Sequence, residues 1–152
     1  MVAHQRWWSR IIDFDMKCRK MKPWKSTVHQ LTSVVEYFDM FEWDDLGSVS
    51  QVKQMLIKDP RTLPSSPGVY KIVYGDHDYI GRAIRYGGLR RRIKEHLNNP
   101  SAQWNDPSEE TRYHVKIIAM DEKMHGRLLA RIVEAVLIEL SQPTLNRNGK
   151  RG

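Results

Sequence analysis

The stretch "PGVYKIVYGDHDYIGRA", from Pro67 to Ala83, holds two short apolar clusters, each with a tyrosine, on either side of a polar turn. The run "GVYKIVY" is rich in the β-branched and aromatic residues that favour strands, and "GDHD" supplies turn residues. The pattern predicts a tight β-hairpin with one tyrosine in each arm. Taken alone, Tyr70 and Tyr79 would be interpreted as a cross-strand aromatic pair that packs the hairpin.

The residues after the hairpin predict a helix, a strand and a second helix. "GGLRRRIKEHLNN" predicts a helix that begins near Leu89 and ends at Asn98, and "RYHVKIIAM" alternates as a third strand does. A longer helix is expected from about Glu122 to Leu140. This order predicts an α+β domain with a small three-stranded, mainly antiparallel sheet flanked by helices.

The residues before the hairpin predict a mainly helical segment. Helical spacing of apolar residues runs through "TVHQLTSVVEYFDM", and Ser50 is expected to cap a short helix, "QVKQMLIK". The proline-rich stretch "DPRTLPSSPG" predicts a linker or boundary. We therefore divide the chain into a helical N-terminal segment, residues 1–62, and a second domain, residues 63–152.

The composition fits a globular protein of ordinary domain size. The chain has 152 residues, of which 40% are hydrophobic, and no apolar run approaches the roughly 20 residues that a membrane helix needs. The N-terminus lacks the apolar core of a signal peptide. The single cysteine, Cys18, excludes an internal disulfide and a cysteine-rich zinc site. These features predict a cytoplasmic protein without a membrane partner.

The charge favours a polyanionic partner. The formal net charge is +7 and the pI about 9.6, and each contact with a nucleic-acid phosphate releases condensed counterions. Five arginines and no acidic residue lie between positions 82 and 92: Arg82, Arg85, Arg90, Arg91 and Arg92. The guanidinium fork matches the oxygens of a phosphate, so this cluster favours phosphate binding.

The motifs resemble the GIY-YIG nuclease family. Gly68-Val69-Tyr70 is followed nine residues later by Tyr79-Ile80-Gly81, the spacing typical of that family's signature. The resemblance continues through Arg92 and His96, in an Arg-x3-His arrangement, and through Glu134 with Asn146 twelve positions on. It covers roughly residues 63–148, a little over half of the chain.

The resemblance implies a phosphodiester hydrolysis that depends on a divalent metal. It implies that Glu134 holds one metal ion, Mg²⁺ or Mn²⁺, through its carboxylate and bound waters. Tyr70 would be the general base or would orient the attacking water, and a nearby cation would have to lower its pKa for the first role. Arg92 would clamp the phosphate and stabilise its developing charge.

The remaining motif residues have supporting roles in this resemblance. Tyr79 and His96 would hydrogen-bond the phosphate or the attacking water, and Asn146 would hold the site together through its side chain. Gly81 would let the backbone turn closely at the end of the hairpin. The basic residues expected to contact DNA are Lys71, Arg82, Arg85, Arg90 and Arg91.

Two choices stay open in the sequence. Thirteen residues separate Tyr79 from Arg92, more than in compact family members, so Arg90 or Arg91 could take the place of Arg92. Glu139 rivals Glu134, because it lies at the edge of the predicted apolar face of the helix. The pairing of Arg92 with His96 and the position of Asn146 favour Arg92 and Glu134.

The sequence therefore predicts a site-specific endonuclease that cuts duplex DNA, of a restriction or phage type. A repair, structure-selective or single-strand nuclease is one alternative, and a basic nucleic-acid-binding module without activity is another. Residues 1–62 would supply DNA contacts or a dimer interface. A homodimer or higher oligomer is expected for a double-strand cut, since one such site cuts one strand.

Overall fold

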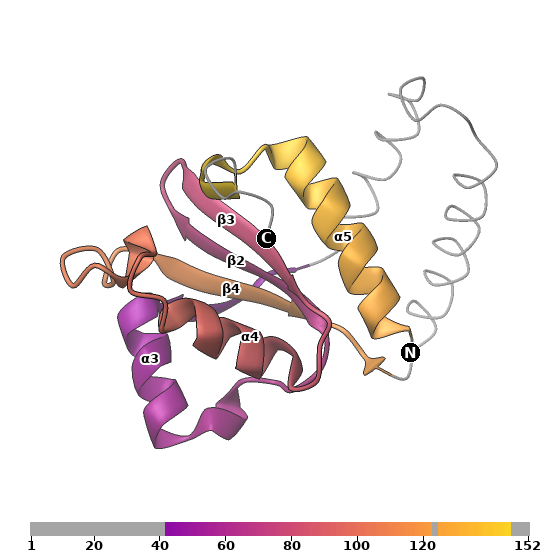
Figure 1. Ribbon diagram of the computed structural model, residues 1–152, viewed down its shortest axis with the longest axis horizontal. Coiled ribbons are helices and arrows are strands. Elements are labelled where there is room, and N and C mark those ends of the chain that lie inside the picture. The colour runs from indigo at the N-terminus through magenta and orange to yellow at the C-terminus, as the bar shows by residue number, and fades with distance from the viewer. Residues whose placement is uncertain (1–41, 123–124, 147–152) are drawn as a thin grey trace. The chain divides into compact units, whose positions relative to one another are not determined.

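The computed structural model describes residues 42–122 and 125–146 (Figure 1). The chain divides into two compact units, Met1–Met40 and Phe41–Gly152, and all of the described residues belong to the second. The helix predicted over residues 27–40 lies outside the described residues. None of the helices in the described part is long and apolar enough to cross a membrane.

The central feature is an antiparallel sheet of four strands in the order β1-β4-β2-β3. The strands are β1 (Asp44–Ser48), β2 (Gly68–Tyr74), β3 (His77–Ala83) and β4 (His114–Ala119). The predicted hairpin is confirmed, because β2 pairs with β3 along its whole length through a turn at Gly75 and Asp76. The third predicted strand is also confirmed, as β4, which pairs with the other side of β2.

The α+β class is confirmed, but the predicted number of three strands is wrong because β1 adds a fourth. The sequence of β1, "DDLGS", consists largely of residues that are depleted in strands, so it shows no strand pattern. It pairs with β4 across an irregularity between Asp45 and Gly47, where Gly47 has a φ of 103°. Pairing with an existing strand, rather than local propensity, makes this segment extended.

Three α-helices flank the sheet: α3 (Val49–Lys58), α4 (Gly88–Leu97) and α5 (Gly126–Ser141). Helix α3 begins two residues earlier than predicted, because Ser48 rather than Ser50 is its N-cap. The Ser48 hydroxyl accepts from the Gln51 backbone N–H, and the Gln51 side chain accepts from the Ser48 backbone N–H, which forms a capping box. Short 3₁₀ turns lie at η2 (Pro60–Thr62), η3 (Gln103–Asn105) and η5 (Thr144–Asn146).

The helices cover both faces of the sheet (Figure 1). Helices α3 and α4 pack on the face that carries Tyr70 and Ile72 of β2, and this side holds the main hydrophobic core. Helix α5 packs on the opposite face, against β2 and β3, where the alternation of strand residues places Val69 and Ile80. The strand β3 is one edge of the sheet and contacts both α4 and α5.

The segment Pro64–Ser66 fixes the start of α4. The first backbone N–H groups of that helix donate to it, Leu89 to the Ser66 carbonyl at 3.0 Å and Arg90 to the Pro64 carbonyl at 3.0 Å. These bonds satisfy donors that a helix start otherwise leaves unpaired. Gly88 makes the close approach possible, since a Cβ there would overlap the carbonyl oxygens of both Ser65 and Ser66.

Residues 44–62, which the sequence assigned to the N-terminal segment, belong to the sheet unit. Val49 and Val52 of α3 are fully buried, and they share one core with Leu63 and with residues of β2 and α4. The proline-rich stretch around η2 therefore joins two parts of one unit that the structure describes.

Candidate active site

The two hairpin tyrosines lie on the same face of the sheet. Tyr70 pairs with Gly81 across β2 and β3, while Tyr79 pairs with Ile72, so the tyrosines are diagonal neighbours rather than directly opposite. Their ring centroids are 6.1 Å apart. Position 81 needs a glycine because there is no room for a side chain: a Cβ on Gly81 would lie 2.5 Å from Cζ of Tyr70. Gly81 stands within β3, not at a close turn, so the role expected for it was wrong.

Tyr70 is the most unusual of these side chains. It is completely buried, and its hydroxyl has no hydrogen-bond partner among the described residues. Burial raises the pKa of this phenol well above its usual value, and the neighbouring Tyr79 raises it further, against the opposing charge of Arg92. The hydroxyl is therefore protonated at neutral pH, and Tyr79 and Arg92 lie close enough to act on its pKa.

An aromatic cluster surrounds the tyrosines. The His96 ring on α4 lies 5.4 Å from the Tyr70 ring and 5.2 Å from the Tyr79 ring, between centroids. Trp104 of η3 lies 5.4 Å from Tyr79 and stacks on His96 at 6.1 Å. Burial and the charge of Arg92 lower the pKa of His96 to about 4, so the imidazole is neutral at pH 7. Trp104 was not predicted as a site residue, because it lies in a loop without a motif.

Of the three consecutive arginines, Arg90 has a different partner from Arg91 and Arg92. Arg90 donates through Nε to the Leu63 carbonyl at 2.8 Å, which ties it to the segment before β2. Arg91 and Arg92 both pair with Glu95, at 2.9 Å and 3.2 Å. Of the three, Arg92 is the one whose charge acts on the pKa of Tyr70, of His96 and of Glu134. Of the three arginines considered for the catalytic role, Arg92 is therefore the one near the other candidate site residues, and it is also the one that the pairing with His96 favoured.

Glu134 reaches the same region from the opposite helical layer. Its carboxylate pairs with the Arg82 guanidinium at 2.7 Å, and its side chain is only 16% exposed. Burial raises the pKa of Glu134, while Arg82 and then Arg92 oppose that rise. The rival glutamate, Glu139, is exposed on α5. Of the two, Glu134 is the carboxylate that lies near Arg92.

Asn146 fastens the C-terminal 3₁₀ turn to the edge of the sheet. Its side-chain oxygen accepts from the Ile80 backbone N–H at 2.8 Å, and its side-chain nitrogen donates to the Ile80 carbonyl at 2.7 Å. One amide thus pairs with β3 as a neighbouring strand would. Thr144 continues the contact, since its hydroxyl accepts from the Asp78 backbone N–H at 3.3 Å.

Of the predicted catalytic side chains, Tyr79, Arg92 and Glu134 line one groove of about 550 Å³ beside β3, whereas Tyr70, His96 and Asn146 do not line it. Tyr79 comes from β3, Arg92 from α4 and Glu134 from α5, so residues of three elements line the groove. Basic residues predicted to bind DNA line the same groove: Arg82, Arg85 and Arg91. Lys71 does not line it, and pairs instead with Asp78 at 3.7 Å.

The groove suits a magnesium ion held by a single protein carboxylate. No cluster of three or more histidine, cysteine, aspartate or glutamate side chains occurs in the described residues, so these offer no all-protein cage. Mg²⁺ commonly keeps several waters and binds through one or two carboxylates and a substrate phosphate. The partly buried Glu134 carboxylate fits that requirement, whereas the Tyr70 hydroxyl is buried and does not line the groove. The Arg82 guanidinium would have to share this carboxylate with the ion.

Comparison with known proteins adds no relative: no family model, no curated protein and no solved structure matches the chain.

Proposed function

We propose that this protein is a divalent-metal-dependent endonuclease of the GIY-YIG type, which hydrolyses phosphodiester bonds of duplex DNA at specific sites. One observation carries the proposal: a single groove is lined by Tyr79, Arg92 and Glu134 from three separate elements. A packing pair of tyrosines would not need an arginine and a partly buried carboxylate beside it. A plain surface glutamate would not be 16% exposed next to two arginines.

The chain's own groups would divide the chemistry between them. Arg92 would bind the scissile phosphate and stabilise the negative charge that develops on it. The protonated Tyr70 hydroxyl would orient the attacking water, because its raised pKa opposes the phenolate form. Tyr79 would hydrogen-bond the phosphate, and neutral His96 could accept a proton, as a charged imidazole could not.

Glu134 would hold the metal ion, Mg²⁺ or Mn²⁺, which when bound supplies a Lewis acid for the phosphate oxygens. Asn146 would act at a distance from the phosphate, as a positioning residue that keeps β3 in place. Arg82, Arg85 and Arg91 would bind neighbouring phosphates along the groove. A second copy of the chain would be needed to cut both strands.

One observation favours a different function, a nucleic-acid-binding module without catalysis. Glu134 already has a close partner in Arg82, at 2.7 Å, and such a pair can be purely structural. In that case the basic groove would bind DNA, and no metal would be involved. Binding would then be the same with and without a chelator.

The test is cleavage of supercoiled plasmid by the full chain, with Mg²⁺ and with EDTA, for the wild type and for Glu134→Gln. We expect discrete linear fragments with the wild type and Mg²⁺ only. Glutamine keeps the shape of glutamate and a hydrogen-bond acceptor for Arg82, so the variant should fold and lose cleavage. The matched control is Glu139→Gln, on the same helix but exposed.

Each result selects one function. Nicking, or degradation without discrete bands, would replace the site-specific duplex enzyme with a repair or single-strand nuclease. Plasmid binding without cleavage in any condition would leave the binding module. Cleavage that survives in Glu134→Gln and disappears in Glu139→Gln would show that Glu139, not Glu134, holds the metal.

A further inference from the structure

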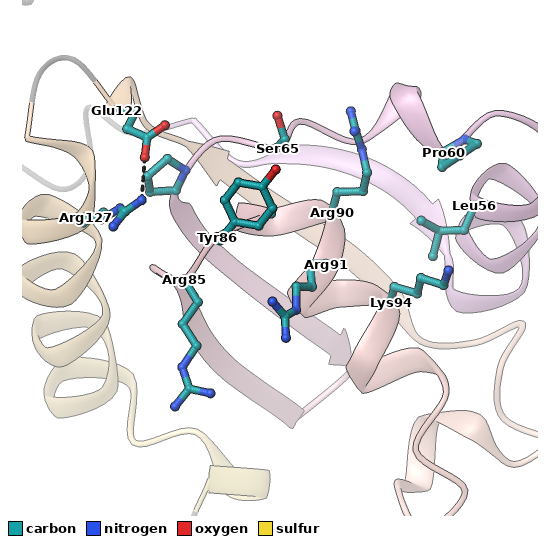
Figure 2. Close-up of a pocket in the computed structure, with 12 residues that line it drawn as sticks. Leu56, Pro60, Ser65, Arg85, Tyr86, Arg90, Arg91, Lys94, Glu122 and Arg127 are labelled. Atoms are coloured by element: carbon teal, nitrogen blue, oxygen red, sulfur yellow. Dashed lines mark hydrogen bonds and ion pairs between the residues drawn. The ribbon is translucent and has the colours of Figure 1, made fainter.

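A second groove, also of about 550 Å³, lies next to the candidate active site (Figure 2). Its walls come from the end of α3, the segment before β2, the loop between β3 and α4, and the first turn of α5. The two grooves share three lining residues, Arg85, Tyr86 and Arg91. They are therefore adjacent, and the part of the loop 84–87 that holds Arg85 and Tyr86 lines both and forms the ridge between them.

The charge of this second groove is strongly positive. Five basic side chains line it against one carboxylate, that of Glu122, which pairs with Arg127 at 2.7 Å. Arg90 and Arg91 also have partners, the Leu63 carbonyl and Glu95. Arg85 and Lys94 make no ion pair with any residue in the described ranges, so both charges are available to a ligand.

The groove also carries an aromatic ring that the protein does not use in its own packing. Tyr86 is 86% exposed, the largest exposure among the large hydrophobic side chains of the described residues. Figure 2 shows its ring in the middle of the groove, with Arg85 and Arg91 to one side of it. A tyrosine hydroxyl among cations is one of the side-chain groups that proteins use to hydrogen-bond the phosphates of duplex DNA.

The start of α4 takes no part in anion binding here. The backbone N–H groups of Leu89 and Arg90, which a helix start usually leaves without a partner, already donate to the Ser66 and Pro64 carbonyls. The side chains are therefore the groups available to a ligand, and the fixed helix start holds Arg90, Arg91 and Lys94 in place along one wall.

We propose that this second groove binds the stretch of DNA next to the cleavage site, with Arg85 and Lys94 on its phosphates and the Tyr86 hydroxyl donating a hydrogen bond to a phosphate. The inference rests on the proposed nuclease function, because it extends the path of one strand beyond Arg92. The two grooves meet at the ridge that holds Arg85 and Tyr86. A DNA strand bound in the candidate active site can therefore continue either across this ridge into the second groove or in the opposite direction. Unpaired charge and an exposed tyrosine favour the ridge.

Binding without cleavage tests the proposal. A short fluorescein-labelled duplex is titrated with the full chain in EDTA at several salt concentrations, and its anisotropy is measured. The double variant Arg85→Gln, Lys94→Gln should bind more weakly, and the slope of log K against log salt should become shallower by roughly 0.9 for each phosphate that the variant no longer neutralises. Tyr86→Phe should weaken binding about fivefold, because it removes only the hydroxyl that binds a phosphate, and Tyr86→Leu should weaken it to a similar extent.

The control is Arg112→Gln, which removes an exposed arginine that lines neither groove. Equal effects of the double variant and this control, after allowance for the second charge, would show a general charge effect and overturn the proposal. An unchanged salt slope in the double variant would overturn it as well, even if plasmid cleavage establishes the nuclease. Binding that follows the proposal, together with an uncut plasmid, would retain the groove and reject the enzyme.

Discussion

Tyr70 is completely buried, and its hydroxyl has no hydrogen-bond partner within the described residues. An unsatisfied buried polar group costs stability, typically about 1–3 kcal/mol. A protein optimised only for stability would place phenylalanine here. The role proposed for Tyr70, contact with a ligand or water during function, would account for this cost.

Replacing Tyr70 by phenylalanine tests this conflict between stability and function. We expect Tyr70→Phe to be as stable as the wild type or more stable, by about 1 kcal/mol, because it removes an unpaired polar group. Cleavage should fall by about 10²-fold or more, as when a group that positions or transfers a proton is removed. Urea unfolding and plasmid cleavage measure the two effects, and a clear loss of stability would mean that the hydroxyl is bonded within the protein.

His96 predicts how stability depends on pH. Its folded pKa of about 4 lies below the ordinary value of 6.5, so the unfolded chain binds the proton more readily. The contribution of the neutral His96 ring to the free energy of unfolding is complete above pH 6.5 and is lost as the pH falls towards 4. The ring is partly exposed and faces Arg92 and Glu95, so solvent screening reduces the effect to about 1–2 kcal/mol.

Unfolding in urea between pH 4 and 7.5 measures this contribution. The variant His96→Gln should have a flatter profile than the wild type across that interval, since it lacks the titrating ring. Identical profiles would show that the imidazole is as accessible to protons in the folded protein as in the unfolded chain.

At single positions, the sequence predicted those members of the site that belong to a recognisable motif. Tyr70 and Tyr79 were predicted from the resemblance of their motif and Arg92 from its pairing with His96, and the structure brings Tyr79, Arg92 and Glu134 into one groove. Trp104 was missed because a tryptophan in a loop has no periodic pattern to indicate its neighbours. The contact between Arg82 and Glu134 could not be predicted either, since the pair is 52 positions apart and forms only when two layers meet.

Among the elements, the hairpin and α4 follow directly from local patterns, whereas β1 does not. Alternation and turn residues identify β2 and β3, and apolar spacing identifies α4 and α5. The strand β1 depends on the edge that β4 offers it, a contact between residues about 70 positions apart. Tertiary pairing of this kind overrides weak strand propensity.

The junction between the segment 64–66 and α4 can be tested with two matched glycines. Gly88 and Gly75 have nearly the same backbone conformation, with φ of 53° and 54°. A Cβ on Gly75 meets nothing within 4 Å, while one on Gly88 would overlap two backbone carbonyl oxygens. Gly75→Ala should therefore cost about 1 kcal/mol, from the left-handed conformation alone.

Gly88→Ala should cost about 3 kcal/mol or more, because the overlap adds to the same conformational cost. The difference between the two variants isolates the packing of the helix start against Ser65 and Ser66. Thermal unfolding of both variants measures it. Equal losses in the two variants would mean that this junction yields easily, and that it does not hold the cations of α4 in place.

At the scale of the molecule, positive charge and the two grooves coincide at one end of α4. The net charge of +7 is a property of the whole chain, but the grooves concentrate it where Tyr79 and Glu134 lie. Composition could predict a polyanionic partner, because it needs no knowledge of geometry. It could not predict the path of that partner, since the ridge at Tyr86 is formed by a loop that folds between two helices.

The extent of the folded unit is the last property that the structure allows to be tested. The sequence placed a boundary after residue 62, but β1 and α3 share the sheet and core of the later residues. A fragment of residues 42–152 should fold cooperatively, with a sharp thermal transition by circular dichroism. A fragment of residues 63–152 should not, because it loses the fully buried Val49 and Val52, worth about 1.5–3 kcal/mol each, from a stability of about 5–15 kcal/mol. It also leaves the outer edge of β4 unpaired, which favours aggregation. Cooperative unfolding of the shorter fragment would instead support the boundary that the proline-rich stretch predicted.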